Sequence, residues 1–158
     1  MQNISSEVTQ KLINNNLSIT FMESCTSGLL ASMFTDTQGA SAVFKGSYVT
    51  YSNEAKIACG VASSVIDTYG VYSKECARAM ASSAKESFGA DIAVGITGST
   101  GNIDPNNADS VQGEAFYCII IGEDIFDYHI KTDVSTMSRQ EIKQMYANEV
   151  YKSLSFMI

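Results

Sequence analysis

Three short polar segments of the sequence combine hydroxyl, amino and backbone groups that could do chemistry. They are Glu23 to Gly28 (ESCTSG), Tyr48 to Lys56 (YVTYSNEAK) and Thr97 to Asn102 (TGSTGN). Each follows or ends a run of residues typical of a β-strand. Because ligands of open α/β sheets bind beyond the carboxyl ends of the strands, these segments are where a functional site is expected.

The first segment offers a nucleophile beside the start of a helix. Ser24 could attack a carbonyl carbon, and the backbone N–H groups that follow could hold an oxyanion or a phosphate, since a helix N-terminus favours negative charge. The candidate binding residues of this turn are Cys25, Thr26, Ser27 and Gly28. A second interpretation stays open, because small hydroxyl residues before a helix are more often caps than nucleophiles.

A serine nucleophile needs a base, and the chain offers few. The only histidine, His129, alternates with Asp127 and Lys131, so we expect it on the solvent face of its strand. Lys56 is the remaining familiar base, but an ordinary lysine pKa of roughly 10.4 leaves it protonated at pH 7. Lowering that pKa by about three units takes about 4 kcal/mol, which burial and a helix N-terminus could supply together.

Tyr51 precedes Lys56 in the same segment and could share the proton that leaves the serine. The strand ends at Tyr51, and Ser52 or Asn53 can cap a helix whose first turn holds Lys56. Taken alone, however, the segment favours a solvated lysine paired with neighbouring Glu54. The sequence thus leaves a catalytic and a surface interpretation of Lys56.

The third segment follows a buried strand and is rich in N–H groups and hydroxyls that could cradle a phosphate or carboxylate. Its spacing fits neither the dinucleotide-binding fingerprint nor the P-loop. The candidate binding residues here are Thr97, Gly98, Ser99, Thr100 and Gly101. A plain tight turn is the alternative.

Composition excludes several classes of function. The 158 residues carry 10 Lys and Arg against 17 Asp and Glu, and this net charge of −7 disfavours nucleic acid and anionic membranes as partners. The longest apolar run, Phe116 to Ile121, is far shorter than the roughly 20 residues of a membrane helix, and the polar start lacks a signal peptide, so we expect a cytoplasmic protein. Four scattered cysteines without a C-x-x-C pair predict free thiols and no metal site.

Strands and helices alternate in the pattern that would position these segments. Strands are expected at 18–22, 46–51, 91–97, 113–121 and 126–132, the last two joined as a hairpin across 122–125. Helices are expected at 29–34, 53–58, 63–69 and 73–88, after a first helix capped by Ser5 or Ser6 and before a last helix opened by the capping box at Ser138. This order predicts a single domain, 1–158, with a three-layer α/β/α sandwich, a mixed, mostly parallel sheet and a C-terminal hairpin plus helix.

Several ordered motifs together resemble the CinA C-terminal domain family, also known as PncC or nicotinamide-nucleotide amidase. The family's E-S-C-T-G-G appears as Glu23 to Gly28 and its G-x-V-x-Y-S-N-x-x-K as Gly46 to Lys56, with one extra residue before Val49. Its P-G-S-S-x-x-F, G-x-V-S and A-D-x-A-x-x-x-T-G segments are similar to 38–44, 70–73 and 90–98. The resemblance covers nearly the whole chain.

The resemblance implies a serine amidohydrolase with Ser24 as nucleophile, assisted by Tyr51 and Lys56. The implied reaction converts nicotinamide mononucleotide to nicotinic acid mononucleotide and ammonia, a step of pyridine nucleotide salvage, without metal or organic cofactor. A homodimer is also implied. Arg139 and Lys143 resemble a basic pair at the start of the family's last helix. Together with the loop from Thr97 to Gly101, Arg139 is the candidate for binding the substrate phosphate.

Three departures from the family pattern bear on the substrate. Ser27 stands in the place of a glycine, and the T-G-x-A-G-P-x-G-G loop reads 97–105 here, without its proline and double glycine. The later P-V-G-T of the family reads Val111 to Glu114 (VQGE). Two alternatives follow. Cys25 could replace Ser24 as the nucleophile, although no histidine partner is evident, or the chain could be a non-catalytic nucleotide-binding or regulatory module associated with competence.

Overall fold

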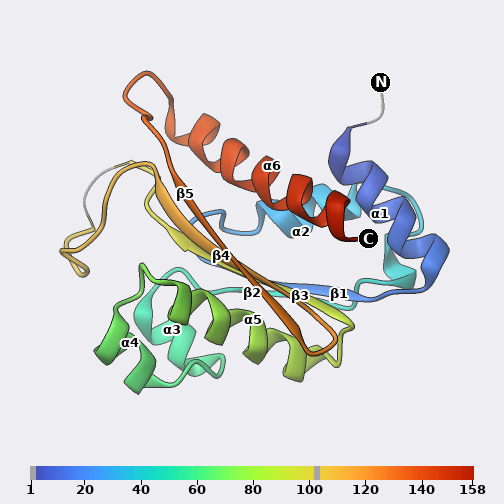
Figure 1. The fold of residues 1–158 in the computed structure, drawn as a ribbon, viewed down its shortest axis with the longest axis horizontal. Helices are drawn as coiled ribbons and strands as arrows, with labels where there is room; N and C mark the ends of the chain where they lie inside the picture. The colour runs from blue at the N-terminus through green and yellow to red at the C-terminus, as the bar shows by residue number, and fades with distance from the viewer. Residues whose placement is uncertain (1–2, 102–103) are drawn as a thin grey trace.

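Apolar strands alternate with helices along the chain, which closes with a hairpin and a long helix (Figure 1). The computed structural model describes residues 3–101 and 104–158. Within these residues the strands are β1 (Ile19–Glu23), β2 (Tyr48–Val49), β3 (Ile92–Gly98), β4 (Glu114–Ile121) and β5 (Asp124–Lys131). The helices are α1 (Ile4–Asn15), α2 (Leu29–Thr35), α3 (Asn53–Ala58), α4 (Ser63–Tyr69), α5 (Lys74–Phe88) and α6 (Arg139–Met157), with a 3-10 turn η1 (Ala40–Ala42).

The strands form one mixed sheet in the order β2-β1-β3-β4-β5. β1 pairs in parallel with β2 and β3, whereas β4 runs antiparallel to both β3 and β5. Every strand except β4 therefore points the same way. The carboxyl ends of β1, β2 and β3 meet at one edge, and the three polar segments of the sequence analysis follow these ends.

Helices cover both faces of this sheet, which confirms the predicted three-layer architecture (Figure 1). α1, α2 and α6 pack on one face, and α3, α4 and α5 lie on the other. The larger core lies under α6, where Tyr146 and Tyr151 are fully buried against Phe21 and Ile119. On the opposite face Gly95 lets α5 approach β3 so closely that a Cβ there would lie 2.3 Å from the Ala77 carbonyl oxygen.

The helix caps largely follow the sequence, with one correction. Ser52 and Ser73 cap α3 and α5, and Ser138 forms the predicted capping box of α6. α1, however, is capped by Asn3 and not by Ser5 or Ser6, because the Asn3 side chain accepts the Ser6 N–H at 2.8 Å. The helix consequently begins at Ile4.

All five strands differ from the expected boundaries, three of them by a single residue at one or both ends and two by more. The strand expected at 46–51 pairs only at Tyr48–Val49, since it lies at the edge of the sheet and its chain turns into α3. β5 begins at Asp124, so the hairpin turns across Gly122 and Glu123 alone, and the positive φ of Gly122 (60°) suits so tight a turn. In the part of the chain that the structure describes, no helix has both the length and the apolar character needed to span a membrane.

Candidate active site

Ser24 and Lys56 meet at the carboxyl edge of the sheet. Lys56 Nζ donates to Ser24 Oγ at 3.0 Å and to the Thr50 carbonyl oxygen at 2.9 Å. The two residues are 32 positions apart in sequence and come from different elements, the turn after β1 and helix α3. This contact joins a hydroxyl to an amine in the geometry that a nucleophile and its base require.

Lys56 is buried, with only 1% of its surface exposed. Burial lowers its pKa from the ordinary value of 10.5, and this effect outweighs the opposing influence of Cys76, Cys25 and Asp104. The interpretation of Lys56 as a solvated lysine paired with Glu54 is therefore wrong. Helix α3 is only six residues long, so its main contribution is to carry the side chain inward from the Ser52 cap.

Glu23 holds the turn that carries Ser24. Its carboxylate is fully buried and accepts the Thr26 hydroxyl (2.7 Å), the Leu30 N–H (2.8 Å) and the Ala31 N–H (3.1 Å). Burial raises the pKa of Glu23, although these hydrogen bonds oppose the rise. The N-terminus of α2 is thus already occupied by a side chain of the protein, a role that the sequence analysis missed.

The amides of Cys25 and Thr26 differ from those that follow. The Ser27 N–H donates to the Ser24 carbonyl oxygen and the Leu29 N–H to that of Thr26. By contrast, the N–H groups of Cys25 and Thr26 donate to no backbone carbonyl oxygen among the described residues. They are the two amides next to Ser24 that an oxyanion could use.

Cys25 is a poor candidate for the nucleophile. Only 4% of its surface is exposed, and burial, helped by the nearby Glu23 charge, raises the pKa of its thiol to about 12. Since the thiolate is the reactive form, this environment keeps the sulfur inert near neutral pH. The geometry therefore favours Ser24 over Cys25.

Ser27 takes a left-handed conformation, with φ of 45°. Glycine adopts this region without strain, which explains the glycine of the family motif at this position. The exposed Ser27 hydroxyl accepts a hydrogen bond from Lys143 Nζ at 2.9 Å. Thr26, Ser27 and Gly28, predicted as binding residues, do not line the cavity described below.

The third segment forms one wall of the site. Gly98 is required at the end of β3, because a Cβ there would lie 2.6 Å from that of Ala115. Ser99 is anchored on both sides, its N–H donating to the Glu114 carbonyl oxygen (3.0 Å) and its own carbonyl oxygen accepting the Tyr146 hydroxyl (2.6 Å). Thr97 is buried beneath this wall and does not line the cavity.

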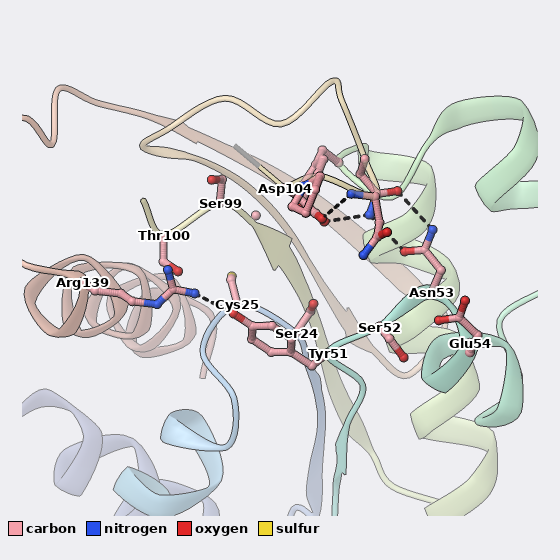
Figure 2. Close-up of a pocket in the computed structure, with 15 residues that line it drawn as sticks. Ser24, Cys25, Tyr51, Ser52, Asn53, Glu54, Ser99, Thr100, Asp104 and Arg139 are labelled. Atoms are coloured by element: carbon pink, nitrogen blue, oxygen red, sulfur yellow. Dashed lines mark hydrogen bonds between the residues drawn. The ribbon is translucent and has the colours of Figure 1, made fainter. Parts of the chain in front are cut away.

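Ser24 opens into a cavity of about 580 Å³. Figure 2 shows Ser24 and Cys25 between the Ser99–Thr100 wall and the ring of Tyr51, with Arg139 at one side. Arg139, at the start of α6, donates to the Tyr51 hydroxyl at 2.6 Å. That hydroxyl is therefore directed at Arg139 in the described structure rather than at Ser24 or Lys56.

The opposite wall of the cavity is a polar network around Asp104. The Asp104 carboxylate accepts the Tyr72 hydroxyl (2.8 Å), the Asn107 side-chain amide (2.7 Å) and the Asn106 N–H (2.9 Å). Asn107 also exchanges hydrogen bonds with Asn53, the first residue of α3 (Figure 2). This network ties the third segment to the helix that carries Lys56. Its residues carried no recognisable sequence signal.

Other expectations concern residues outside the cavity. His129 is exposed and bonded to Glu114 at 2.9 Å, as expected of a hairpin histidine, and it does not line the cavity at Ser24. Within 3–101 and 104–158, no group of three or more His, Cys, Asp or Glu side chains could hold a metal ion. Residue 102 of the third segment lies outside the described residues.

The whole chain, residues 1–158, matches the family model of the CinA C-terminal domain. The chain belongs to this family. It is 34% identical to the "Protein MG115 homolog" of Mycoplasma pneumoniae over 96% of this chain and 94% of that protein. It is 41% identical to a "CinA-like protein" of Fervidobacterium nodosum over 72% of this chain, but that match spans only 28% of the longer relative.

Solved CinA structures share the fold. A CinA superfamily protein from Klebsiella pneumoniae superimposes with a TM-score of 0.88 at 22% identity, covering 97% of this chain and 96% of that one. A competence/damage inducible protein from Agrobacterium tumefaciens gives a TM-score of 0.85 at 26% identity, covering 98% and 95%. The mixed α/β architecture of this chain is therefore the one found in solved CinA structures, consistent with its family membership.

Proposed function

We propose that this chain is a serine amidohydrolase that converts nicotinamide mononucleotide to nicotinic acid mononucleotide and ammonia. The observation that supports this most strongly is the 3.0 Å contact between Oγ of Ser24, which lines the cavity, and the buried amine of Lys56, whose pKa is lowered. The CinA family includes amidohydrolases. The substrate follows from the motif resemblance.

In the proposed mechanism neutral Lys56 takes the proton of Ser24, whose Oγ forms a bond to the carboxamide carbon. The tetrahedral intermediate collapses as the C–N bond breaks, and the Lys56 ammonium returns the proton to the departing nitrogen, so that ammonia leaves. Water then attacks the acyl-enzyme, with Lys56 again accepting a proton. Nicotinic acid mononucleotide is released and Ser24 is regenerated.

The oxyanion is assigned to the N–H groups of Cys25 and Thr26. The sequence analysis included the whole turn to Gly28, but Glu23 takes the amides at the start of α2. Two preorganised donors beside the nucleophile are sufficient for an oxyanion hole.

The substrate phosphate is assigned to Arg139 with Thr100, which lines the cavity, and with Gly101, which does not line it but lies beside Arg139. A Cβ added to Gly101 would lie 3.5 Å from an Arg139 guanidinium nitrogen, so loop and guanidinium are adjacent. When Arg139 turns to a phosphate, it releases the Tyr51 hydroxyl, which can then assist proton transfer at Ser24. Substrate binding and completion of the catalytic trio are thereby linked.

The test is to incubate the purified chain with nicotinamide mononucleotide and follow both products. We expect Ser24→Ala to lower the rate by at least about 10³-fold without unfolding the protein. Ser32→Ala, on the exposed face of α2, is the matched control and should retain full activity. Product formation that survives Ser24→Ala would overturn the mechanism, and activity that survives Cys25→Ala would exclude Cys25 as the nucleophile.

Binding of the nucleotide without any product would favour the second candidate, a non-catalytic regulatory module. The observation behind this candidate is the departure of 97–105 from the family loop. The homodimer and cytoplasmic location expected from the sequence remain predictions, and light scattering of the purified chain tests the first.

A further inference from the structure

The cavity beside Ser24 is electrically asymmetric. Arg139 lies on one side and the Asp104 carboxylate on the other, with Ser24 between them (Figure 2). The proposed function gives Arg139 a phosphate, but it gives Asp104 nothing to bind. A charged group in an active-site cavity calls for a reason, because a carboxylate there would otherwise have to be kept hydrated.

Asp104 is built to remain ionised. Partial burial alone would raise its pKa, yet the hydrogen bonds from Asn107, Asn106 and Tyr72 outweigh burial and hold the pKa below its usual range. Three donors on two oxygens also fix the orientation of the carboxylate. In the described part of the chain, no Lys, Arg or His forms an ion pair with it.

Asp104 is also unhelpful to the base. Its negative charge lies close enough to Lys56 to raise the pKa of that amine, against the burial that lowers it. A role in activating Ser24 therefore does not explain the carboxylate. Nor does the shared family pattern, since Asp104 stands where the family motif has a glycine.

We infer that Asp104 is a specificity residue that recognises the positive charge of a pyridinium ring in the substrate. The inference rests on the proposed function and refines it: this site takes carboxamides carried on N-substituted, cationic pyridines and disfavours their neutral counterparts. A ligand with a cationic ring and an anionic phosphate matches the two poles of the cavity, with its carboxamide at Ser24. Charge complementarity of this kind sets specificity more than raw affinity.

The experiment compares two ligands that differ in ring charge. Nicotinamide mononucleotide has a pyridinium ring, and its reduced 1,4-dihydro form has a neutral ring with the same carboxamide and phosphate. Dissociation constants are measured by calorimetry in the Ser24→Ala background, where turnover is absent. We expect the cationic ligand to bind at least about 10-fold more tightly than the neutral one.

Three further substitutions in that background locate the source of the preference. Asp104→Asn should weaken the cationic ligand about 10-fold and leave the neutral one unchanged, whereas Asp104→Glu, which keeps the charge, should retain the preference. Glu54→Gln removes the other carboxylate of the cavity lining and should change neither constant. Thermal denaturation of each variant checks folding.

The outcomes separate this inference from the proposed function. An equal loss for both ligands in Asp104→Asn, or no loss, would overturn the inference, as would a preference that disappears in Glu54→Gln instead. Turnover by the native chain together with either result would leave the amidase assignment standing. Charge-selective binding that depends on Asp104, without turnover by the native chain, would overturn the amidase assignment alone.

Discussion

The cavity has a catalytic wall at Ser24, with Lys56 buried behind it, and a loop wall around Asp104, and these two walls are built in different ways. The wall that carries Ser24 and Lys56 is buried, and its polar side chains are bound largely by backbone groups, as when Glu23 accepts amides of α2 and Lys56 donates to Thr50. The wall around Asp104 is partly exposed and relies on side chains that bind one another, as in the Asn53–Asn107 pair.

This difference assigns catalysis to the first wall and substrate specificity to the second. Backbone groups of strands and helices keep their positions when neighbouring side chains change, so they can hold a nucleophile and its base to within a few tenths of an ångström. A network of loop side chains changes with every substitution, so such a wall can alter which substrate the site prefers. The family motifs are retained on the first wall except at Ser27, and the motif of the second is altered more extensively at 97–105.

The largest effect is expected at Lys56. Lys56→Met should lower kcat by about 10³-fold or more, because the base is lost, while the free energy of unfolding stays the same or rises by about 1 kcal/mol, because a buried amine is costly. Urea denaturation and product formation measure the two quantities. Lys11→Met, on the exposed face of α1, is the control, and a variant that loses stability in proportion to activity would contradict the division between walls.

The lowered pKa of Lys56 also makes the difference between the native chain and Lys56→Met depend on pH. Between the folded-state pKa and the ordinary value of 10.5, the unfolded chain binds the proton that the folded chain has released. Stability contributed by Lys56 therefore rises with pH across this window and is lowest below it. The difference in unfolding free energy between the native chain and Lys56→Met should follow this rise, and kcat should increase through the same lowered pKa. A difference that is flat with pH would refute the assignment.

Glu23→Gln should have the next largest effect. The amide cannot accept all the hydrogen bonds that the two carboxylate oxygens accept, so the variant should lose about 1–3 kcal/mol of stability and, through movement of Ser24, about 10-fold in kcat. Denaturation and kinetics are compared with those of Glu86→Gln on the exposed face of α5. Unchanged kcat would show that the Ser24 turn does not need this carboxylate.

A smaller, different effect is expected on the loop wall. Asn107→Ala removes the hydrogen bonds to Asn53 and Asp104, so KM for nicotinamide mononucleotide should rise about 10-fold while kcat changes by less than about threefold. Asn106→Ala is the control, because Asn106 binds Asp104 through its backbone N–H. A fall in kcat as large as that expected for Glu23→Gln would contradict the claim that the wall around Asp104 affects substrate binding more than catalysis.

The smallest effect is expected at Ser27. Ser27→Gly removes a side chain from a left-handed position and should raise stability by about 1 kcal/mol or less, while loss of the hydroxyl that accepts Lys143 should lower kcat by less than about threefold. Ser32→Gly, in the right-handed helix α2, should instead lower stability by about 1 kcal/mol. Thermal denaturation of both variants is the measurement. Stability changes of the same sign in both variants would refute the argument that Ser27 is strained by its left-handed conformation.

Sequence patterns predicted the parts of the fold and site that depend on local or strongly restricted choices. Strand and helix order, the caps at Ser52, Ser73 and Ser138, and the pairing of Ser24 with Lys56 as candidates all came from residue types and spacing. The cap at Asn3 was missed because Asn, Ser5 and Ser6 are almost equally good caps.

Contacts across long stretches of chain could not be predicted in the same way. The Arg139 bond to Tyr51 joins residues 88 positions apart, and nothing in either local sequence specifies it. The burial of Lys56 was equally invisible, because exposed and buried lysines have the same neighbours in sequence. Asp104 was passed over because Tyr72, 32 positions away in sequence, reaches its carboxylate only in the folded chain.

Helix α6 binds all three polar segments at once. Lys143 reaches Ser27 of the first, Arg139 reaches Tyr51 of the second, and Tyr146 reaches Ser99 of the third. The position of helix α6 therefore helps to set how the nucleophile, the assisting tyrosine and the binding loop are aligned with one another. A rotation of α6 about its own axis would move these three contacts together, so a substitution that shifts this helix should disturb all three polar segments at once.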